Sequence, residues 1–99
     1  MANYIVLFGF TDQGVRNIKD SPARVKAAKK IFQDLGAKVK DFYLVMGFGQ
    51  YDTLFMVEAP DDETVSKASL KIGSLGSVHT DTHRVFTEGE FQKIIGNLP

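Results

Sequence analysis

The chain has 99 residues, the size of one small domain that can bury a core without disulfides or metals, so we expect residues 1–99 to form a single domain. Twelve basic residues balance twelve acidic ones, which argues against nucleic acid or anionic lipid as a partner. The absence of cysteine excludes disulfides and a thiol nucleophile. The N-terminal apolar run ends at Phe10, too short for a signal peptide or a membrane span, so we expect a cytoplasmic location and no membrane contact.

The first part of the chain predicts a strand followed by helical segments. Residues 4–10 are apolar on both alternating faces, which is typical of a central strand. A short helical segment is expected over residues 13–19. A longer helix then begins at Ser21, with Pro22 in its first turn, and ends at Gly36. Apolar residues at steps of three and four give this helix one buried face.

The middle of the chain predicts a β-hairpin. Residues 37–46 begin with alternating polarity and then become apolar, as in a strand that starts at a sheet edge. Residues 47–50 contain two glycines and form the loop. Residues 51–59 return as a strand that is apolar on both faces from Leu54 to Val57.

The last third predicts a helix, an edge strand and a final helix. Asp61 caps the first of these helices, whose predicted buried face consists of Val65, Ala68, Ser69 and Ile72. Residues 77–87 alternate and are mostly polar, which suits an edge strand. Thr87 and Glu90 form a capping box at the start of the last helix. The predicted apolar face of that helix consists of Phe91, Ile94, Ile95 and Leu98.

The order of these elements predicts the fold class. It is an α+β domain with a ferredoxin-like βαββαβ core, a four-stranded antiparallel sheet and a C-terminal helix. Right-handed crossovers give the strand order 4-1-3-2, which places the first and third strands in the centre. Those two strands are apolar on both faces, whereas the second and fourth carry charges, as edge strands do.

The sheet face opposite the two main helices predicts a partner. On the third strand Leu54 and Met56 alternate with Phe55 and Val57, so neither face is polar. Monomers rarely expose apolar patches larger than a few hundred Å². We therefore predict a homodimer that packs sheet to sheet about a two-fold axis. The alternative is that the last helix folds across this face and no dimer is needed.

Several segments resemble the GYD family of small bacterial and archaeal proteins, named for a Gly-Tyr-Asp signature. Tyr51 and Asp52 match the signature, and either Gly47 or Gly49 supplies its glycine. Other matching segments are Thr11-Asp12-Gln13-Gly14, Asp41-Phe42-Tyr43, Glu58-Ala59-Pro60-Asp61-Asp62, Gly73-Ser74-Leu75-Gly76 and Thr87-Glu88. The resemblance covers essentially the whole chain and implies a fold of the dimeric α/β-barrel type. It implies no single activity, because related barrel dimers include cofactor-free monooxygenases, isomerases, haem enzymes and amino-acid-sensing modules.

The Tyr51-Asp52 pair is the first candidate site. A phenol and a carboxylate suit proton transfer or ligand anchoring, but neighbouring side chains of a strand point to opposite faces. We favour a structural interpretation, in which a glycine adopts positive φ, the tyrosine packs and the aspartate bonds turn amides.

The fourth strand contains the second candidate site. Alternation places His79, Asp81 and His83 on one face, but Cα atoms four residues apart in a strand are separated by ~13 Å. We therefore predict a polar edge strand and no metal site. Because imidazole generally titrates near neutrality, either histidine remains a candidate general base.

Several basic residues are candidates for binding an anion. Arg84 lies on the other face of the fourth strand and is expected to hold a ligand carboxylate or, more commonly, to form an internal ion pair with Asp41 or Glu58. Arg24, together with Arg16 and Lys40, could bind an anion near the helix start at Ser21-Pro22, although solvated surface charge is the commoner outcome. The glycine-rich loop lacks the Gly-Lys-Ser/Thr context of a phosphate loop, and we expect no cofactor.

Three functions remain open. The first is a homodimeric small-molecule-binding domain, with a pocket between sheet and helices and with Tyr51, Asp52, Arg84 and Phe42 as ligand-binding candidates. Its expected walls are Tyr4, Val6, Phe8, Phe42, Tyr43, Phe55 and Phe86. The second is a cofactor-independent monooxygenase- or isomerase-like enzyme whose proton-transfer residue is His79, His83, Tyr43 or Tyr51. The third is a structural or regulatory interaction module.

Overall fold

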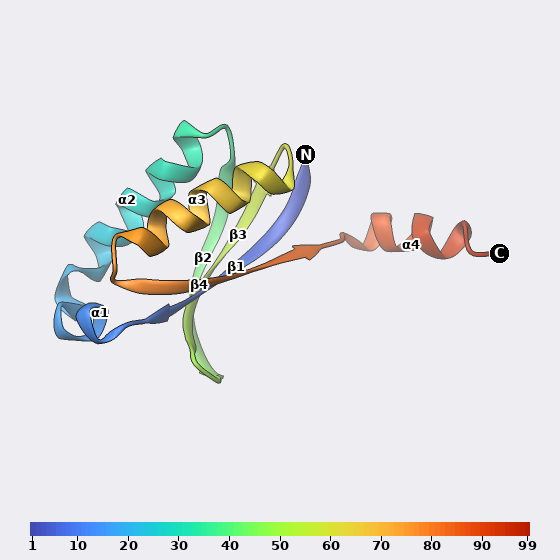
Figure 1. Cartoon of the computed structure of the whole chain (residues 1–99). Helices are drawn as coiled ribbons and strands as arrows, with labels where there is room; N and C mark the ends of the chain where they lie inside the picture. The colour runs from blue at the N-terminus through green and yellow to red at the C-terminus, as the bar shows by residue number, and fades with distance from the viewer.

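The computed structural model describes residues 1–99 and has the predicted order of elements (Figure 1). The strands are β1 (Ala2–Phe10), β2 (Lys38–Phe48), β3 (Tyr51–Ala59) and β4 (Val78–Val85). The helices are α1 (Asp12–Arg16), the 3-10 helix η1 (Ile18–Asp20), α2 (Ser21–Asp34), α3 (Asp62–Ser74) and α4 (Glu88–Gly96). The helical segment expected over residues 13–19 is divided at Asn17 into α1 and η1. None of the helices combines the length and the apolar character that crossing a membrane requires.

The four strands form one antiparallel sheet in the order β2-β3-β1-β4, which confirms the predicted ferredoxin-like order. Val6 in β1 faces Phe55 in β3 on one side and Thr82 in β4 on the other. The strands that are apolar on both faces therefore lie in the centre, where backbone groups find partners on both sides.

Helices α2 and α3 cover one face of the sheet, and the core lies between these two layers (Figure 1). Phe55 is its centre, with only 1% of its surface exposed. Its ring packs edge-on against Phe8, Phe32 and Phe42, with ring centroids 4.9, 5.8 and 5.8 Å away. Edge-to-face geometry matches the quadrupoles of aromatic rings, so these contacts add to the gain from burial.

The residues that were predicted to begin and end the helices do so in the structure. The Asp61 side chain accepts the Thr64 N–H at 2.9 Å and begins α3, whose buried residues are the predicted four. Thr87 and Glu90 form both hydrogen bonds of the capping box that begins α4. Gly36 follows α2 with φ of 87°, a conformation that a side chain would disfavour.

Two polar contacts tie α3 to the sheet beneath it. The Tyr4 hydroxyl donates to Asp62 Oδ1 at 2.5 Å, and Ser69 Oγ lies 3.1 Å from Thr82 Oγ1. Burial and the hydrogen bond to Asp62 raise the pKa of Tyr4 to about 12. The phenol is therefore a donor, and remains one well above neutral pH.

The hairpin between β2 and β3 is longer than predicted. β2 continues to Phe48, which pairs with Tyr51, so the turn is reduced to Gly49 and Gln50. Gly49 has φ of 62°, as the first turn position of a type II′ hairpin requires. Gly47 also has positive φ, and it lies where the register shifts between Leu44 and Phe48. Both glycines therefore have a conformational role.

The second face of the sheet and helix α4 have no covering layer. α4 projects from the end of β4, away from the sheet, and the molecule measures 52 × 31 × 18 Å (Figure 1). The alternative in which the last helix folds across the open face of its own sheet is therefore wrong.

Candidate functional site

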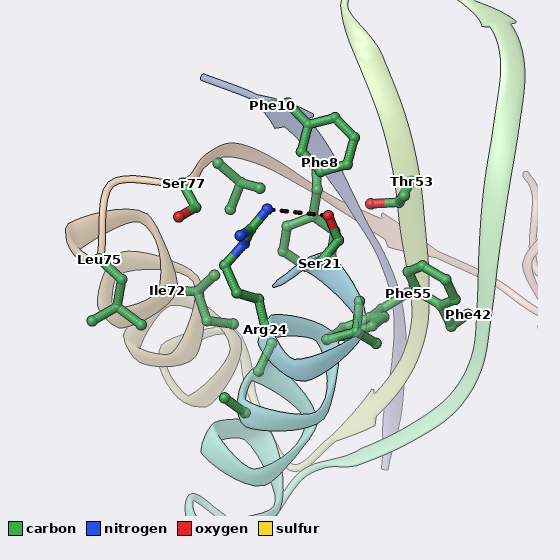
Figure 2. A pocket seen from close by; sticks show the side chains of 14 residues that line it. Phe8, Phe10, Ser21, Arg24, Phe42, Thr53, Phe55, Ile72, Leu75 and Ser77 are labelled. Carbon is green, nitrogen blue, oxygen red and sulfur yellow. Dashed lines mark hydrogen bonds between the residues drawn. The ribbon is translucent and has the colours of Figure 1, made fainter. Parts of the chain in front are cut away.

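A cavity of about 120 Å³ lies between the sheet and helices α2 and α3 (Figure 2). Phe8, Phe42 and Phe55 of the sheet form one side, and α2 and α3 form the other. The remaining lining residues are Phe10, Ser21, Arg24, Val25, Ala27, Ala28, Thr53, Ile72, Leu75, Ser77 and Val78. Apolar walls with a few polar groups are the usual composition of a small-molecule pocket.

Arg24 is the only charged residue that lines the cavity. Its Nη1 donates to the Asn17 carbonyl at 2.8 Å, and its Nη2 donates to the Gly14 carbonyl at 3.2 Å. Nη2 also donates to Ser21 Oγ at 3.1 Å (Figure 2). These bonds hold α1 and η1 against the start of α2. A guanidinium has five N–H donors, so two remain for a ligand.

The end of the cavity is closed by the segment after β1, which is tied to the loop after α3. Thr11 Oγ1 donates to the Gly76 carbonyl at 2.6 Å, and the Thr11 N–H donates to the Ser77 carbonyl at 3.1 Å. Gly14 is buried directly against Ser77, and a Cβ there would overlap the Ser77 carbonyl. Glycine at this position thus permits the close approach that brings Ser77 to the lining.

A second group of polar side chains lies on the open face of the sheet. The Tyr51 hydroxyl donates to Asp81 Oδ2 at 2.8 Å, and His83 Nε2 lies 3.2 Å from the same oxygen. The His79 ring lies beside Tyr51, with centroids 5.8 Å apart. We call Tyr51, His79, Asp81 and His83 the open-face cluster. The prediction that the two histidines and Asp81 share a face is confirmed by their pairing with Gly9, Leu7 and Ile5.

Gly9 makes the open-face cluster possible. It lies in β1 between Tyr51 and His79, and a Cβ there would overlap both the His79 ring and the Gln50 carbonyl. With hydrogen in place of a side chain, the imidazole and the start of β3 close over β1. Tyr51 can then reach across β1 to Asp81.

The hydrogen bond between Tyr51 and Asp81 shifts the pKa of each of these two groups away from neutrality. The bond to Asp81 is the main cause of the raised pKa of Tyr51, and the bond from Tyr51 is the main cause of the lowered pKa of Asp81. A proton-transfer residue works best when its pKa lies near the working pH. The Tyr51–Asp81 pair is therefore suited to a fixed hydrogen bond more than to proton exchange. No three His, Asp or Glu side chains are grouped so that they could hold a metal ion.

The other predicted site residues are divided between the two faces. Phe42 faces the helices and lines the cavity, as expected of a ligand-binding residue. Tyr43 lies on the open face, in one cross-strand row with Leu54, Leu7 and Asp81. Three strand spacings separate Tyr43 from Asp81, roughly 14 Å, so it is not part of the open-face cluster.

The Asp52 side chain forms a hydrogen bond with the backbone of the neighbouring strand. Its Oδ2 accepts the N–H of Phe10 at 2.9 Å, where the ladder between β1 and β3 ends. The structural interpretation of the Tyr51-Asp52 pair predicts that Asp52 bonds a turn amide. Asp52 instead bonds an amide at the end of β1, where the start of β3 closes over β1.

Arg84 forms the internal ion pair that is the commoner expectation, but with a different partner. Its Nη2 lies 3.4 Å from Glu90 Oε2 in α4, and its guanidinium lies 4.3 Å above the Phe86 ring. Glu58 pairs instead with Lys40 at 2.9 Å. The expected partners Asp41 and Glu58 are therefore wrong for Arg84.

Only three of the expected walls line the cavity. Phe8, Phe42 and Phe55 do so, whereas Tyr43 lies on the other face of the sheet. The expected walls named no residue of α2 or α3, although the sequence singled out Arg24 as a candidate for binding an anion. The spacing of Ser21, Arg24, Val25 and Ala28 on one side of α2 is the signal that could have identified this wall.

The comparisons with known proteins agree on one family. The GYD domain model matches residues 4–95. A Thermus thermophilus protein named "Glutamine synthetase and cystathionine beta-lyase binding protein" is 39% identical over 83 residues, which are 83% of this chain and 85% of that protein.

Solved structures match the fold. TTHA0845 from Thermus thermophilus is 26% identical with a TM-score of 0.55, and the match covers 88% of this chain and 95% of that one. The leucine response regulatory protein LrpA of Mycobacterium tuberculosis is 16% identical with a TM-score of 0.62, over 87% of this chain and 51% of LrpA. A homoserine dehydrogenase from Thiobacillus denitrificans is 18% identical with a TM-score of 0.60, and the match covers 86% of this chain but only 17% of the enzyme. The last two similarities concern the fold alone.

Proposed function

This chain belongs to the GYD domain family, and we propose that it acts as a homodimeric small-molecule-binding domain. The observation that carries the proposal is the apolar cavity between the sheet and helices α2 and α3, with the Arg24 guanidinium on its lining. Apolar walls bind the body of a ligand through its removal from water, and a single charged group orients it.

The size and chemistry of the cavity define the class of ligand. Its volume is about 120 Å³, and a cavity of ~150 Å³ engineered into another protein holds one benzene molecule. The ligand body is therefore one small ring or a short branched aliphatic chain. A carboxylate on that body would accept a hydrogen bond from one of the two remaining Arg24 donors, which lie on Nε and Nη1, because the two groups have opposite charges.

Benzoate and benzyl alcohol test this proposal, since they share the ring and differ in the charged group. We expect benzoate to shift the NMR signals of cavity residues and to bind more tightly than benzyl alcohol. Ala27→Leu should weaken binding, because Ala27 lines the cavity but is itself exposed, and can be enlarged without disturbing the core. Ala23→Leu is the matched control, on the same helix and outside the lining. Binding that is equal for both variants, or absent for both probes, would contradict the proposed ligand class.

The homodimer is proposed from the open face of the sheet. Ile5, Leu54 and Met56 are only half-buried in the single chain, and Tyr43 on the edge strand is 55% exposed. No element of the chain covers them. A second copy packed on this face would remove them from water, and isologous packing about a two-fold axis is the commonest assembly of soluble proteins.

The enzyme alternative has weaker support. It would assign proton transfer to the open-face cluster, where the carboxylate of Asp81 is already bonded to Tyr51 and His83 lies beside it. The cluster also lies on the opposite face of the sheet from the cavity, so a ligand in the cavity would not contact it. Turnover that is lost on changing His79 or His83 alone would favour this alternative.

Binding of other proteins is a second candidate function, because the Thermus relative is named for binding glutamine synthetase and cystathionine beta-lyase. On this chain Leu70 is 74% exposed on the outer side of α3, away from both the cavity and the open face. Surface plasmon resonance with the two purified enzymes tests this function. Leu70→Glu should weaken binding if α3 is the contact, whereas Gln92→Glu, which adds a charge on α4, should not.

A further inference from the structure

Helix α4 projects from the domain with an uncovered apolar side. We propose that each α4 packs on the β2–β3 hairpin of a second copy, so that two copies exchange their C-terminal helices. This inference rests on the proposed homodimer and adds the contact that would hold it together.

The apolar side of α4 is large for so short a helix. Phe91, Ile94 and Ile95 are exposed by 57, 46 and 50%, and Leu98, two residues past the end of α4, is exposed by 62%. An isolated helix of nine residues is marginal in water, and helices of this length normally depend on packing. α4 therefore needs a surface that its own chain does not supply.

The junction before α4 directs the helix away from its own sheet. Thr87 Oγ1 accepts the Glu90 N–H at 3.1 Å, and Glu90 Oε1 accepts the Thr87 N–H at 2.9 Å. Arg84 adds an ion pair with Glu90 at 3.4 Å and lies above the Phe86 ring. The capping-box bonds belong to the first turn of α4, whereas the Arg84–Glu90 ion pair spans the junction and would be lost if α4 folded back onto its own open face.

The hairpin offers a complementary apolar surface. Leu44, Met46 and Phe48 are exposed by 73, 92 and 46%. The hairpin turn lies by the end of β1, where a Cβ on Gly9 would overlap the Gln50 carbonyl. α4 leaves β4 beside the start of β1, where Val85 pairs with Asn3. The two projecting elements therefore lie at opposite ends of the sheet.

This arrangement suits a two-fold dimer. When two open faces meet, a two-fold axis between them that crosses the line from α4 to the hairpin at right angles brings each α4 to the hairpin of the other copy. The same operation repeats the contact at the opposite end, so the assembly closes as a dimer.

The surface area also matches a second copy. The chain exposes 6577 Å², whereas a compact monomer of 11.0 kDa exposes ~5,600 Å². The excess of about 1,000 Å² is close to the ~800 Å² that each partner buries in a standard interface.

Cross-linking between different chains tests the contact. The protein has no cysteine, so each engineered thiol is unique. A tagged chain with Met46→Cys is mixed with an untagged chain with Ile94→Cys, and a short bismaleimide is added. We expect a cross-linked product with the summed mass of the tagged and untagged chains. Ser66→Cys, exposed on α3, replaces Ile94→Cys in the control and should give little of that product.

Dimer affinity gives an independent measurement. Ile94→Glu should raise the dimer dissociation constant by at least about tenfold, whereas Gln92→Glu on the other side of α4 should leave it unchanged within about twofold. A dimer that forms without the mixed cross-link and tolerates Ile94→Glu would overturn the helix exchange and leave the proposed function standing. A wild-type chain that is monomeric at micromolar concentration would overturn both the exchange and the proposed homodimer.

Discussion

The phenol oxygen of Tyr51 lies 2.8 Å from Asp81 Oδ2, although β1 separates their two strands in the sheet. Gly9 permits this contact, because its missing side chain leaves room for the His79 ring and the start of β3 above β1. The bond connects the beginning of β3 with the edge strand β4, at the end of the sheet where the ladder between β1 and β3 stops.

Replacing Tyr51 by Phe should raise the pKa of Asp81 towards its ordinary value of 3.8, because the Tyr51 hydrogen bond is the main cause of its lowering. A carboxylate with a lowered pKa stabilises the fold above its unfolded-state pKa, and that contribution is lost as pH falls through the folded-state value. Tyr51→Phe should therefore cost more stability at pH 6 than at pH 2. Carboxyl NMR titration and urea unfolding at both pH values measure these effects. Tyr43→Phe, on the same face but outside the cluster, should leave Asp81 unchanged.

Replacing Gly9 by Ala should destabilise the protein by about 1–3 kcal/mol, because the new methyl group overlaps the His79 ring and the Gln50 carbonyl. Gly73→Ala is the matched control, since a Cβ at this position of α3 meets nothing within 4 Å. Alanine is the better helix former, so this control should stabilise the protein by up to about 1 kcal/mol. Urea unfolding of both variants compares them, and equal effects would contradict the role of Gly9.

Replacing Phe55 by Ala should cost about 3–5 kcal/mol, because Phe55 is 1% exposed and packs against three other rings. Phe86→Ala removes a ring of the same size that is 56% exposed. This control should cost far less, since most of its surface is already in water. Chemical denaturation would reveal the difference, and similar losses would mean that the core is centred elsewhere.

The contribution of Tyr4 to the stability of the fold should decrease at alkaline pH. Its pKa is about 12 in the folded chain against an ordinary value of 10.0, so the folded state favours the protonated phenol. The resulting stabilisation is fully present below pH 10 and is lost as pH rises from there through 12. The stability difference between the wild type and Tyr4→Phe should therefore shrink over this range. A difference that stays constant from pH 8 to pH 12 would contradict the role of the Tyr4–Asp62 bond.

Local signals in the sequence were sufficient for most of the fold. The Asp61 cap, the Thr87–Glu90 capping box and the buried side of α3 each depend on residues within a few positions of one another. The strand order followed from the element order and right-handed crossovers, and the two strands that are apolar on both faces agreed with it, because only central strands are covered twice. These features need no knowledge of distant contacts.

The parts that could not be predicted depend on contacts between distant segments. Asp52 bonds the Phe10 amide because β3 crosses β1 at the end of the sheet, and a strand pattern does not encode such a crossing. Arg84 pairs with Glu90 because α4 begins beside it. The cavity wall from α2 could not be predicted from local patterns. Arg24 approaches Phe8 and Phe55 only because the helix lies over the sheet.

Native mass spectrometry of the full chain at micromolar concentration tests the proposed homodimer most directly. A species of twice the 11.0 kDa chain mass, reduced to single chains by Ile94→Glu but not by Gln92→Glu, is the expected result. A wild-type spectrum that contains only the 11.0 kDa species would contradict the homodimer and leave the apolar open face of the sheet unexplained.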